Sequence, residues 1–220
     1  MTSIDGKIIQ LPFRVDLESW RSYYHHLCDE YPDAKWTWDK GVEELDVREA
    51  VVKCTNTQER SMRGWMLQTN RTDDGEPSVM ANSNVRPKQK YIELGLPLWS
   101  WRIDLPLGPV ERLAESVPSV YRWTVYEMPA NGITPTHIDD DENVLLIPLY
   151  WPEKGQEFLL EVDGEWQDWS DVFRADGRAL LLDGHTPHWS CNRSNQTRVN
   201  IMARMPRTDL EQICSVKGVF

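Results

Sequence analysis

The sequence predicts a mainly β protein in which helices flank an antiparallel β-core. Three observations lead to this class. From Ser119 onward, short apolar stretches recur about every ten positions and turn residues separate them, a spacing typical of an all-β sandwich or barrel. Before Ser119 the pattern is helical or irregular. The length of 220 residues suits a single domain.

A first helix is predicted from Leu17 to about Tyr31. Asp16 is a suitable N-cap, and Pro32 ends the run. Apolar residues within it recur at helical spacing, at positions 17, 20, 24 and 27.

The segment that follows alternates between strand and loop character. Strands are expected at 51–54 and 61–67, whereas 69–90 is rich in Asn, Asp, Gly, Pro and Ser and is expected to be a long loop. Loops of that length in compact domains often serve as lids. A second helix is predicted at 110–116, because Pro109 suits the first helical position.

The β-core is expected to contain strands at 119–128, 134–139, 143–150, 157–162, 179–183, 187–191 and 197–204. Turn sequences such as Pro129-Ala130-Asn131-Gly132 and Asp163-Gly164 lie between them. Within one domain, residues 1–118 are therefore expected to form a helical or irregular extension that packs on a core at 119–206. Residues 207–220 would form a tail or a short helix.

Composition excludes some classes of protein. There are 24 Lys and Arg against 35 Asp and Glu, a formal net charge of −11, which argues against nucleic acid as a partner. No window approaches the ~18 apolar residues of a membrane span, and residues 1–14 lack the apolar core of a signal peptide. The four cysteines form no C-x-x-C pair. We expect a cytoplasmic protein; composition indicates no oligomeric state.

The motif His137-Ile138-Asp139 is the first candidate for chemistry. Side chains two apart on a strand point to the same face, so His137 and Asp139 can converge on one ion while Ile138 faces away. Asp141 is an alternative carboxylate, but its position four residues after the histidine, on a path from strand to turn, is less predictable. A lone H-x-D is also common by chance, so a third ligand is needed.

The segment Asp183-Gly184-His185-Thr186-Pro187-His188 offers two candidates for that ligand. His188 is preferred because it follows a proline and opens the next strand, whereas His185 sits in the turn. Two histidines and one carboxylate on one face of a metal, with other positions open, form the arrangement expected of a non-haem Fe(II) oxygenase.

Two longer segments carry a family resemblance. The stretch from Tyr126 to Asp139 (YEMPANGITPTHID) and the stretch from His188 to Arg198 (HWSCNRSNQTR) resemble the tyrosine, H-x-D and distal-histidine segments of the Fe(II)- and 2-oxoglutarate-dependent dioxygenases. The prolyl-hydroxylase-like and aspartyl/asparaginyl-hydroxylase-like branches are the most similar. The resemblance covers roughly residues 120–204 and implies a double-stranded β-helix, or jelly roll.

The resemblance also implies a site. Fe(II) would be held by His137, Asp139 and His188. Arg198 would pair with the distal carboxylate of 2-oxoglutarate, which suits the planar guanidinium fork. Tyr150 lies where some relatives place a hydroxyl on that carboxylate, although a core or surface role is the simpler interpretation.

The implied activity is hydroxylation of a small molecule, an amino acid or peptide-like metabolite, with O2 consumed and succinate and CO2 formed. Asp139 favours this outcome because halogenating relatives have a small residue there. One departure concerns the cosubstrate: many relatives have Arg-x-Ser where this sequence has Arg198-Val199-Asn200, which puts a second hydrogen bond in doubt. Arg204 is the alternative arginine.

Two other classes of protein fit parts of the pattern. A cupin-type metalloenzyme that does not use 2-oxoglutarate would need the same metal ligands without Arg198. A non-catalytic β-sandwich binding module, for a carbohydrate for example, would use some of the 11 tryptophans and need no metal. The roles of the tryptophans and the identity of the substrate do not follow from the sequence.

Overall fold

The computed structural model describes residues 2–4, 7–39, 61–70, 99–102, 104–139 and 142–220. Its N-terminal part contains β1 (Thr2–Ile4), β2 (Ile8–Arg14), α1 (Leu17–Glu30), η1 (Pro32–Ala34), β3 (Trp36–Asp39), β4 (Ser61–Met66), β5 (Gln68–Asn70), β6 (Trp99–Trp101) and α4 (Pro109–Ser116). Its C-terminal part contains β7 (Tyr121–Met128), β8 (Ile133–His137), β9 (Glu142–Tyr150), β10 (Gln156–Val162), β11 (Glu165–Asp168), η3 (Ser170–Val172), β12 (Arg178–Asp183), β13 (His188–Asn192), β14 (Arg198–Pro206), η4 (Arg207–Asp209), α5 (Leu210–Ser215) and β15 (Gly218–Val219). The strand expected at 51–54 and most of the loop expected at 69–90 lie outside the described residues.

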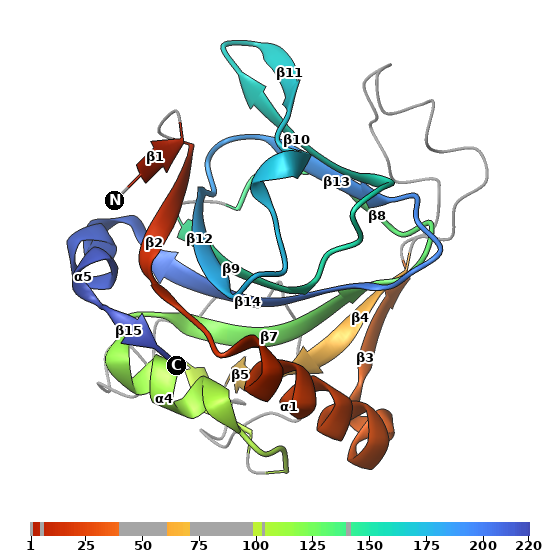
Figure 1. Cartoon of the computed structure of the whole chain (residues 1–220), viewed down its shortest axis with the longest axis vertical. Coiled ribbons are helices and arrows are strands. Elements are labelled where there is room, and N and C mark those ends of the chain that lie inside the picture. The colour runs from red at the N-terminus through yellow and green to blue at the C-terminus, as the bar shows by residue number, and fades with distance from the viewer. Residues whose placement is uncertain (1, 5–6, 40–60, 71–98, 103, 140–141) are drawn as a thin grey trace.

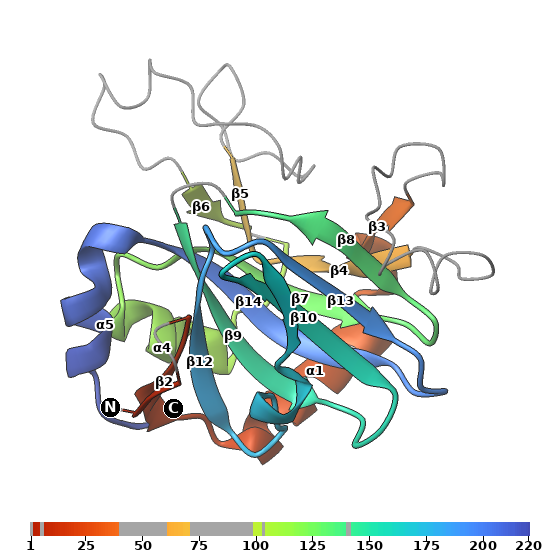
Figure 2. The ribbon, with the colours of Figure 1, turned by 90° about the horizontal axis from the view of Figure 1, so that it is seen from above.

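Eight consecutive strands, β7 to β14, build the core by passing between two sheets (Figure 1). The larger sheet has the order β1-β2-β12-β9-β14-β7-β4-β3, and the smaller has the order β11-β10-β13-β8. Figure 2 shows β8, β13 and β10 lying across β7, β14 and β9, so that the sheets face each other. This topology is that of a jelly roll, and the predicted double-stranded β-helix is confirmed.

All seven strands expected in the core are present. The strand β11, between the turn Asp163-Gly164 and η3, was not predicted. Its sequence is polar and mostly exposed, so it lacks the alternation that marks a half-buried strand. By contrast, β9 and β12 are apolar runs because both faces of the larger sheet are covered.

The N-terminal segment differs from the expected helical or irregular extension. Strand β2 pairs antiparallel with β12 in the larger sheet, and β15 near the C-terminus pairs parallel with β2. Leu11 and Phe13 on β2 are buried, and Phe13 packs edge-on against Phe220. These pairings join residues far apart in the chain, so a local sequence pattern cannot predict them.

Helices α1 and α4 cover the face of the larger sheet that points away from the smaller sheet (Figure 1). The main apolar cluster lies there and includes Trp20 and Leu27 of α1, Leu113 of α4 and Ile201 of β14. A second cluster lies between the sheets and is built from Ile8, Val144, Leu146, Phe158, Leu160, Trp169, Phe173, Leu180 and Leu182. Within the described residues, no helix is long and apolar enough to cross a bilayer.

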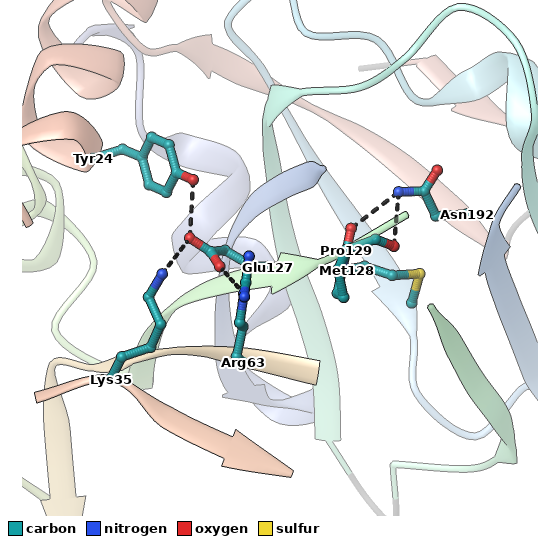
Figure 3. A network of polar contacts seen from close by, with 7 residues as sticks. All are labelled: Tyr24, Lys35, Arg63, Glu127, Met128, Pro129 and Asn192. Atoms are coloured by element: carbon teal, nitrogen blue, oxygen red, sulfur yellow. Dashed lines mark hydrogen bonds and ion pairs between the residues drawn. The ribbon is translucent and has the colours of Figure 1, made fainter. Parts of the chain in front are cut away.

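A buried carboxylate ties the helical layer to the larger sheet. Glu127 on β7 is 1% exposed and receives hydrogen bonds from the Tyr24 hydroxyl, the Lys35 ammonium and the Arg63 guanidinium (Figure 3). A buried charge is costly unless such donors surround it. This network therefore fixes α1, η1 and β4 against β7.

Asn192, at the end of β13, joins the two sheets. Its side-chain amide is fully buried and donates to the carbonyl oxygens of Met128 and Pro129 (Figure 3). It also donates to the carbonyl oxygen of Gln196. Its Oδ1 accepts from Gln156 Nε2 at 2.6 Å. Both ends of one amide thus hold the end of β7 against the smaller sheet.

We expect Asn192→Ala to lower the free energy of unfolding by about 2–4 kcal/mol, because several buried groups lose their partner at once. Urea unfolding at pH 7 measures the change. Asn195→Ala, an exposed asparagine in the turn that follows, is the control and should change stability by less than about 0.5 kcal/mol. Equal stability of the two variants would contradict the assigned role of Asn192.

Candidate metal centre

Three predicted residues come together where β8 and β13 pair. His137 ends β8, His188 opens β13, and the two are direct partners in the antiparallel ladder. Asp139 follows His137 by two residues. Its Oδ1 lies 3.8 Å from His137 Nε2, and its Oδ2 lies 3.3 Å from His188 Nε2. Ile138 between them is 51% exposed and faces away, as the period-two argument predicts.

The surroundings of His188 define which nitrogen faces the other two groups. His188 Nδ1 lies 2.9 Å from the carbonyl oxygen of Thr186. A carbonyl can only accept, so Nδ1 carries the proton and Nε2 presents a lone pair. The ring stacks on Phe158 and is 6% exposed. His185 is exposed in the turn and does not belong to the group.

Asp139 is held by its backbone and by an arginine. Its N–H donates to Gly184 O at 2.8 Å, and Arg204 NH1 lies 2.6 Å from Oδ2. Burial acts to raise the pKa of Asp139. The charge of Arg204 and the nearby imidazoles of His188 and His137 outweigh burial, so the pKa of this carboxyl lies well below its usual value. Asp139 is therefore ionised at neutral pH.

The predicted arginine lies inside the jelly roll. Arg198 on β14 is 2% exposed, donates through NH2 to Ser190 Oγ at 2.9 Å and lies over the ring of Trp151. Its Nε and NH1 have no acceptor among the described residues. Burial lowers the pKa of Arg198 to about 10, which leaves it charged at pH 7. A guanidinium with unmet donors in a buried place suits an anionic ligand.

Two side chains that contact Arg198, those of Ser190 and Trp151, were not singled out from the sequence. Ser190 lies two residues after His188 on β13, and Trp151 follows β9. Tyr126 is buried, and its hydroxyl lies 3.0 Å from Thr134 Oγ1. It is close enough to Arg198 and Asp139 for their charges to act on its pKa, which burial raises. Strand alternation around His188 could have indicated Ser190, but the position of Trp151 depends on packing against Phe173.

Asn200 and Tyr150 fall in different places. Asn200 is 3% exposed, and its Oδ1 has no partner among the described residues. The hydroxyl of Tyr150 lies 2.8 Å from His25 Nε2, and its ring packs against Tyr24 and Arg21 of α1. The structure therefore places the Tyr150 hydroxyl beside α1, whereas Arg198 lies beside Ser190 and Trp151.

The donor set fits a divalent metal ion. One ligand atom from each of His137, Asp139 and His188 lies within 4.8 Å of the others. Groups that bind one ion at about 2.1 Å stand roughly 3–4 Å apart, so small shifts would suffice. Two imidazoles and one carboxylate are the ligands of the facial triad that binds Fe(II). The hydrogen bond at His188 Nδ1 is the support that such ligands usually have.

Solved structures give an independent view of the fold. The non-heme alpha ketoglutarate dependent epimerase SnoN from nogalamycin biosynthesis is similar with a TM-score of 0.50 and 11% identity, over 90% of this chain and 76% of SnoN. The chain shares its fold. A Pseudomonas putida prolyl-4-hydroxylase matches with a TM-score of 0.44 and 14% identity, over 91% of this chain and 93% of that chain. The similarity to SnoN thus agrees with the predicted jelly-roll fold.

Other comparisons add little. The non-heme monooxygenase ThoJ matches with a TM-score of 0.33 and 13% identity over 45% of this chain. The match covers 50% of ThoJ, so the chain spans about half of its length. No protein-family model and no curated protein sequence matches the chain.

We expect His188→Ala to weaken Co(II) binding by at least about 100-fold, since the loss of a ligand exceeds the 10- to 100-fold effect of its supporting partners. Isothermal titration calorimetry on the metal-free protein gives the affinities. His185→Ala, three residues earlier, is the matched control and should bind as wild type does. If His185→Ala were the weaker of the two, the third ligand would be wrongly assigned.

We expect Arg204→Met to lower the free energy of unfolding by about 2 kcal/mol at pH 7, because a largely buried carboxylate loses its partner. The pKa of Asp139 is depressed in the folded protein, so its contribution is complete above the unfolded pKa of about 4 and is lost as the pH falls below it. The gap between wild type and variant should therefore shrink from pH 5 to pH 3.

Urea unfolding of the metal-free protein across that pH range measures the gap. Arg178→Met removes the more exposed pair with Asp176 and should cost less than about 1 kcal/mol. A gap for Arg204→Met that does not change with pH would contradict the link to Asp139.

Proposed function

We propose that the protein is an Fe(II)- and 2-oxoglutarate-dependent oxygenase that hydroxylates a small molecule, an amino acid or a peptide-like metabolite. The observation that carries the proposal is the combination of a His-Asp-His group with a buried arginine whose donors are unmet. The cited SnoN structure, with the same fold, belongs to an alpha ketoglutarate dependent enzyme, which supports the choice of cosubstrate. We also propose a cytoplasmic location.

The roles of the side chains follow from their positions. His137, Asp139 and His188 would hold Fe(II), and Asp139 would bring the single negative charge of the set. Arg204 pairs with Oδ2 of Asp139 and so holds this carboxylate in place. Iron and the keto acid, when bound, supply the oxidising power for hydroxylation, with O2 consumed and succinate and CO2 released.

Arg198 would bind the distal carboxylate of 2-oxoglutarate. Its free Nε and NH1 can donate two charge-assisted hydrogen bonds, and Ser190 and Trp151 hold the guanidinium in place. Asn200 shares the inward side of β14, since residues two apart on a strand face the same way. Its amide could donate the hydrogen bond that a serine provides in Arg-x-Ser relatives.

The alternatives account for less of the structure. A cupin-type enzyme without 2-oxoglutarate needs the three ligands but gives no reason to bury Arg198 with open donors. A binding module gives no reason to hold Nε2 of His188 beside a carboxylate. Asp139 at the ligand position favours hydroxylation over halogenation.

We expect Arg198→Met to raise the dissociation constant of 2-oxoglutarate by roughly 30- to 700-fold, about 2–4 kcal/mol, because a buried charge-assisted contact is lost. Calorimetry with anaerobic Fe(II)-loaded protein measures binding, and succinate release measures turnover. Arg193→Met removes an exposed arginine paired with Glu157 and should bind like wild type.

Asp139→Ala should abolish turnover, and high 2-oxoglutarate should restore it only in Arg198→Met. Metal binding by wild type without any binding of 2-oxoglutarate would select the cupin-type enzyme. Absence of both would select the binding module.

A further inference from the structure

The turn between β12 and β13 supports two of the three candidate ligands through its backbone. The carbonyl oxygen of Thr186 accepts from His188 Nδ1 at 2.9 Å. The carbonyl oxygen of Gly184 accepts the N–H of Asp139 at 2.8 Å. The shape of this turn therefore sets both the ring orientation of His188 and the place of Asp139.

One carboxylate holds the turn in that shape. Asp183 Oδ1 accepts the N–H of His185 at 3.3 Å, and Oδ2 accepts the hydroxyl of Thr186 at 3.2 Å. The backbone of the same residue is also engaged, because its carbonyl oxygen accepts the N–H of Thr186 and its N–H donates to Lys7 O. An aspartate at the start of a turn commonly bonds to the backbone two residues on.

Asp183 lies on the side of β12 away from the metal group. It shares a strand face with Leu181, which packs in the cluster under the helices. There it lines a cavity of about 240 Å³ with Lys7, Asn143 and Arg207. Lys7 and Arg207 lie 3.8 and 3.1 Å from its oxygens, but both are well exposed, so these ion pairs contribute little. The hydrogen bonds to His185 and Thr186, by contrast, lie within the turn itself.

We propose that Asp183 is a positioning residue for the metal centre, acting through the turn that it closes. Its carboxylate fixes Thr186, Thr186 fixes the tautomer and direction of His188, and Gly184 fixes Asp139. Asp183 itself belongs to no metal-ligating group among the described residues. The assignment rests on the proposed metal site but not on the identity of the substrate or the cosubstrate.

The test compares Co(II) affinity, the visible absorption of bound Co(II), and the stability of metal-free protein. Asp183→Ala should weaken Co(II) binding by about 10- to 100-fold and alter the absorption spectrum, as losses of ligand-supporting groups do. Asp176→Ala is the matched control. Asp176 lies two residues before β12, which Asp183 ends, and it likewise accepts the N–H two residues on, that of Arg178. It should bind Co(II) within about threefold of wild type, whatever its stability.

Two further variants keep the test decisive if Asp183→Ala folds poorly. Asp183→Asn retains an acceptor for the turn and should stay within about fivefold of wild type. Thr186→Val removes only the hydroxyl link and should weaken Co(II) binding by about 5- to 20-fold.

Equal Co(II) affinities for Asp183→Ala, Asp176→Ala and wild type would overturn the positioning role and leave the metal site standing. The positioning role would also be overturned if Asp183→Asn bound Co(II) as weakly as Asp183→Ala, because the charge of Asp183 rather than its hydrogen bonds to the turn would then matter. Wild-type protein that binds no Co(II) would overturn the metal site and this role together.

Discussion

The antiparallel register between β8 and β13 is the constraint on which the candidate site depends. His188 lies directly opposite His137, and the ring centroids are 4.2 Å apart. Because side chains alternate along a strand, a slip of one residue would turn His188 to the outer face and bring Trp189 inward. In the observed register Trp189 packs outside with Ile133 and Cys191, while the two imidazoles face Asp139.

This register is secured at both ends of the short β8–β13 ladder. At one end the amide of Asn192 binds the carbonyl oxygens of Met128 and Pro129, just before the turn into β8. At the other end Gly184 O receives the N–H of Asp139 beyond β8. The ladder is irregular between His188 and Ser190, and such bulges are common beside functional sites because they redirect side chains. Two short strands thus gain a precision that their own hydrogen bonds would not provide.

The sequence predicted the parts of the site that follow from local rules. The pairing of His137 with Asp139 follows from the period of two, and His188 was preferred to His185 because a proline precedes it and it opens a strand. The position of the Tyr150 side chain did not follow from the sequence, because its direction depends on non-local packing. The pairing of β14 with β9 shifts between Val199 and Asn200, beside Tyr150, and α1 draws the hydroxyl to His25. Strand β2 was not predicted for the same reason, since its pairing partner β12 lies far along the chain.

Two buried charges show how scaffold and site can be told apart. Glu127 and Arg198 are almost equally buried, at 1% and 2% exposed. Glu127 has three donors from three different elements, so its charge is fully compensated by the protein and its role is to hold layers together. Arg198 has one hydroxyl acceptor and an aromatic face, and two of its nitrogens meet no acceptor in the described part of the chain.

Leaving a buried charge so incompletely paired destabilises the fold by several kcal/mol. Among the residues that the structure describes, no anion pairs with Arg198, although its inward position on β14 points it into the same interior as Ser190 and the histidines. A ligand carboxylate bound to Arg198 would remove this penalty. Glu127 needs no ligand, because three donors of the protein already compensate its charge. The uncompensated charge therefore marks where a ligand binds, whereas the compensated one marks where the layers join.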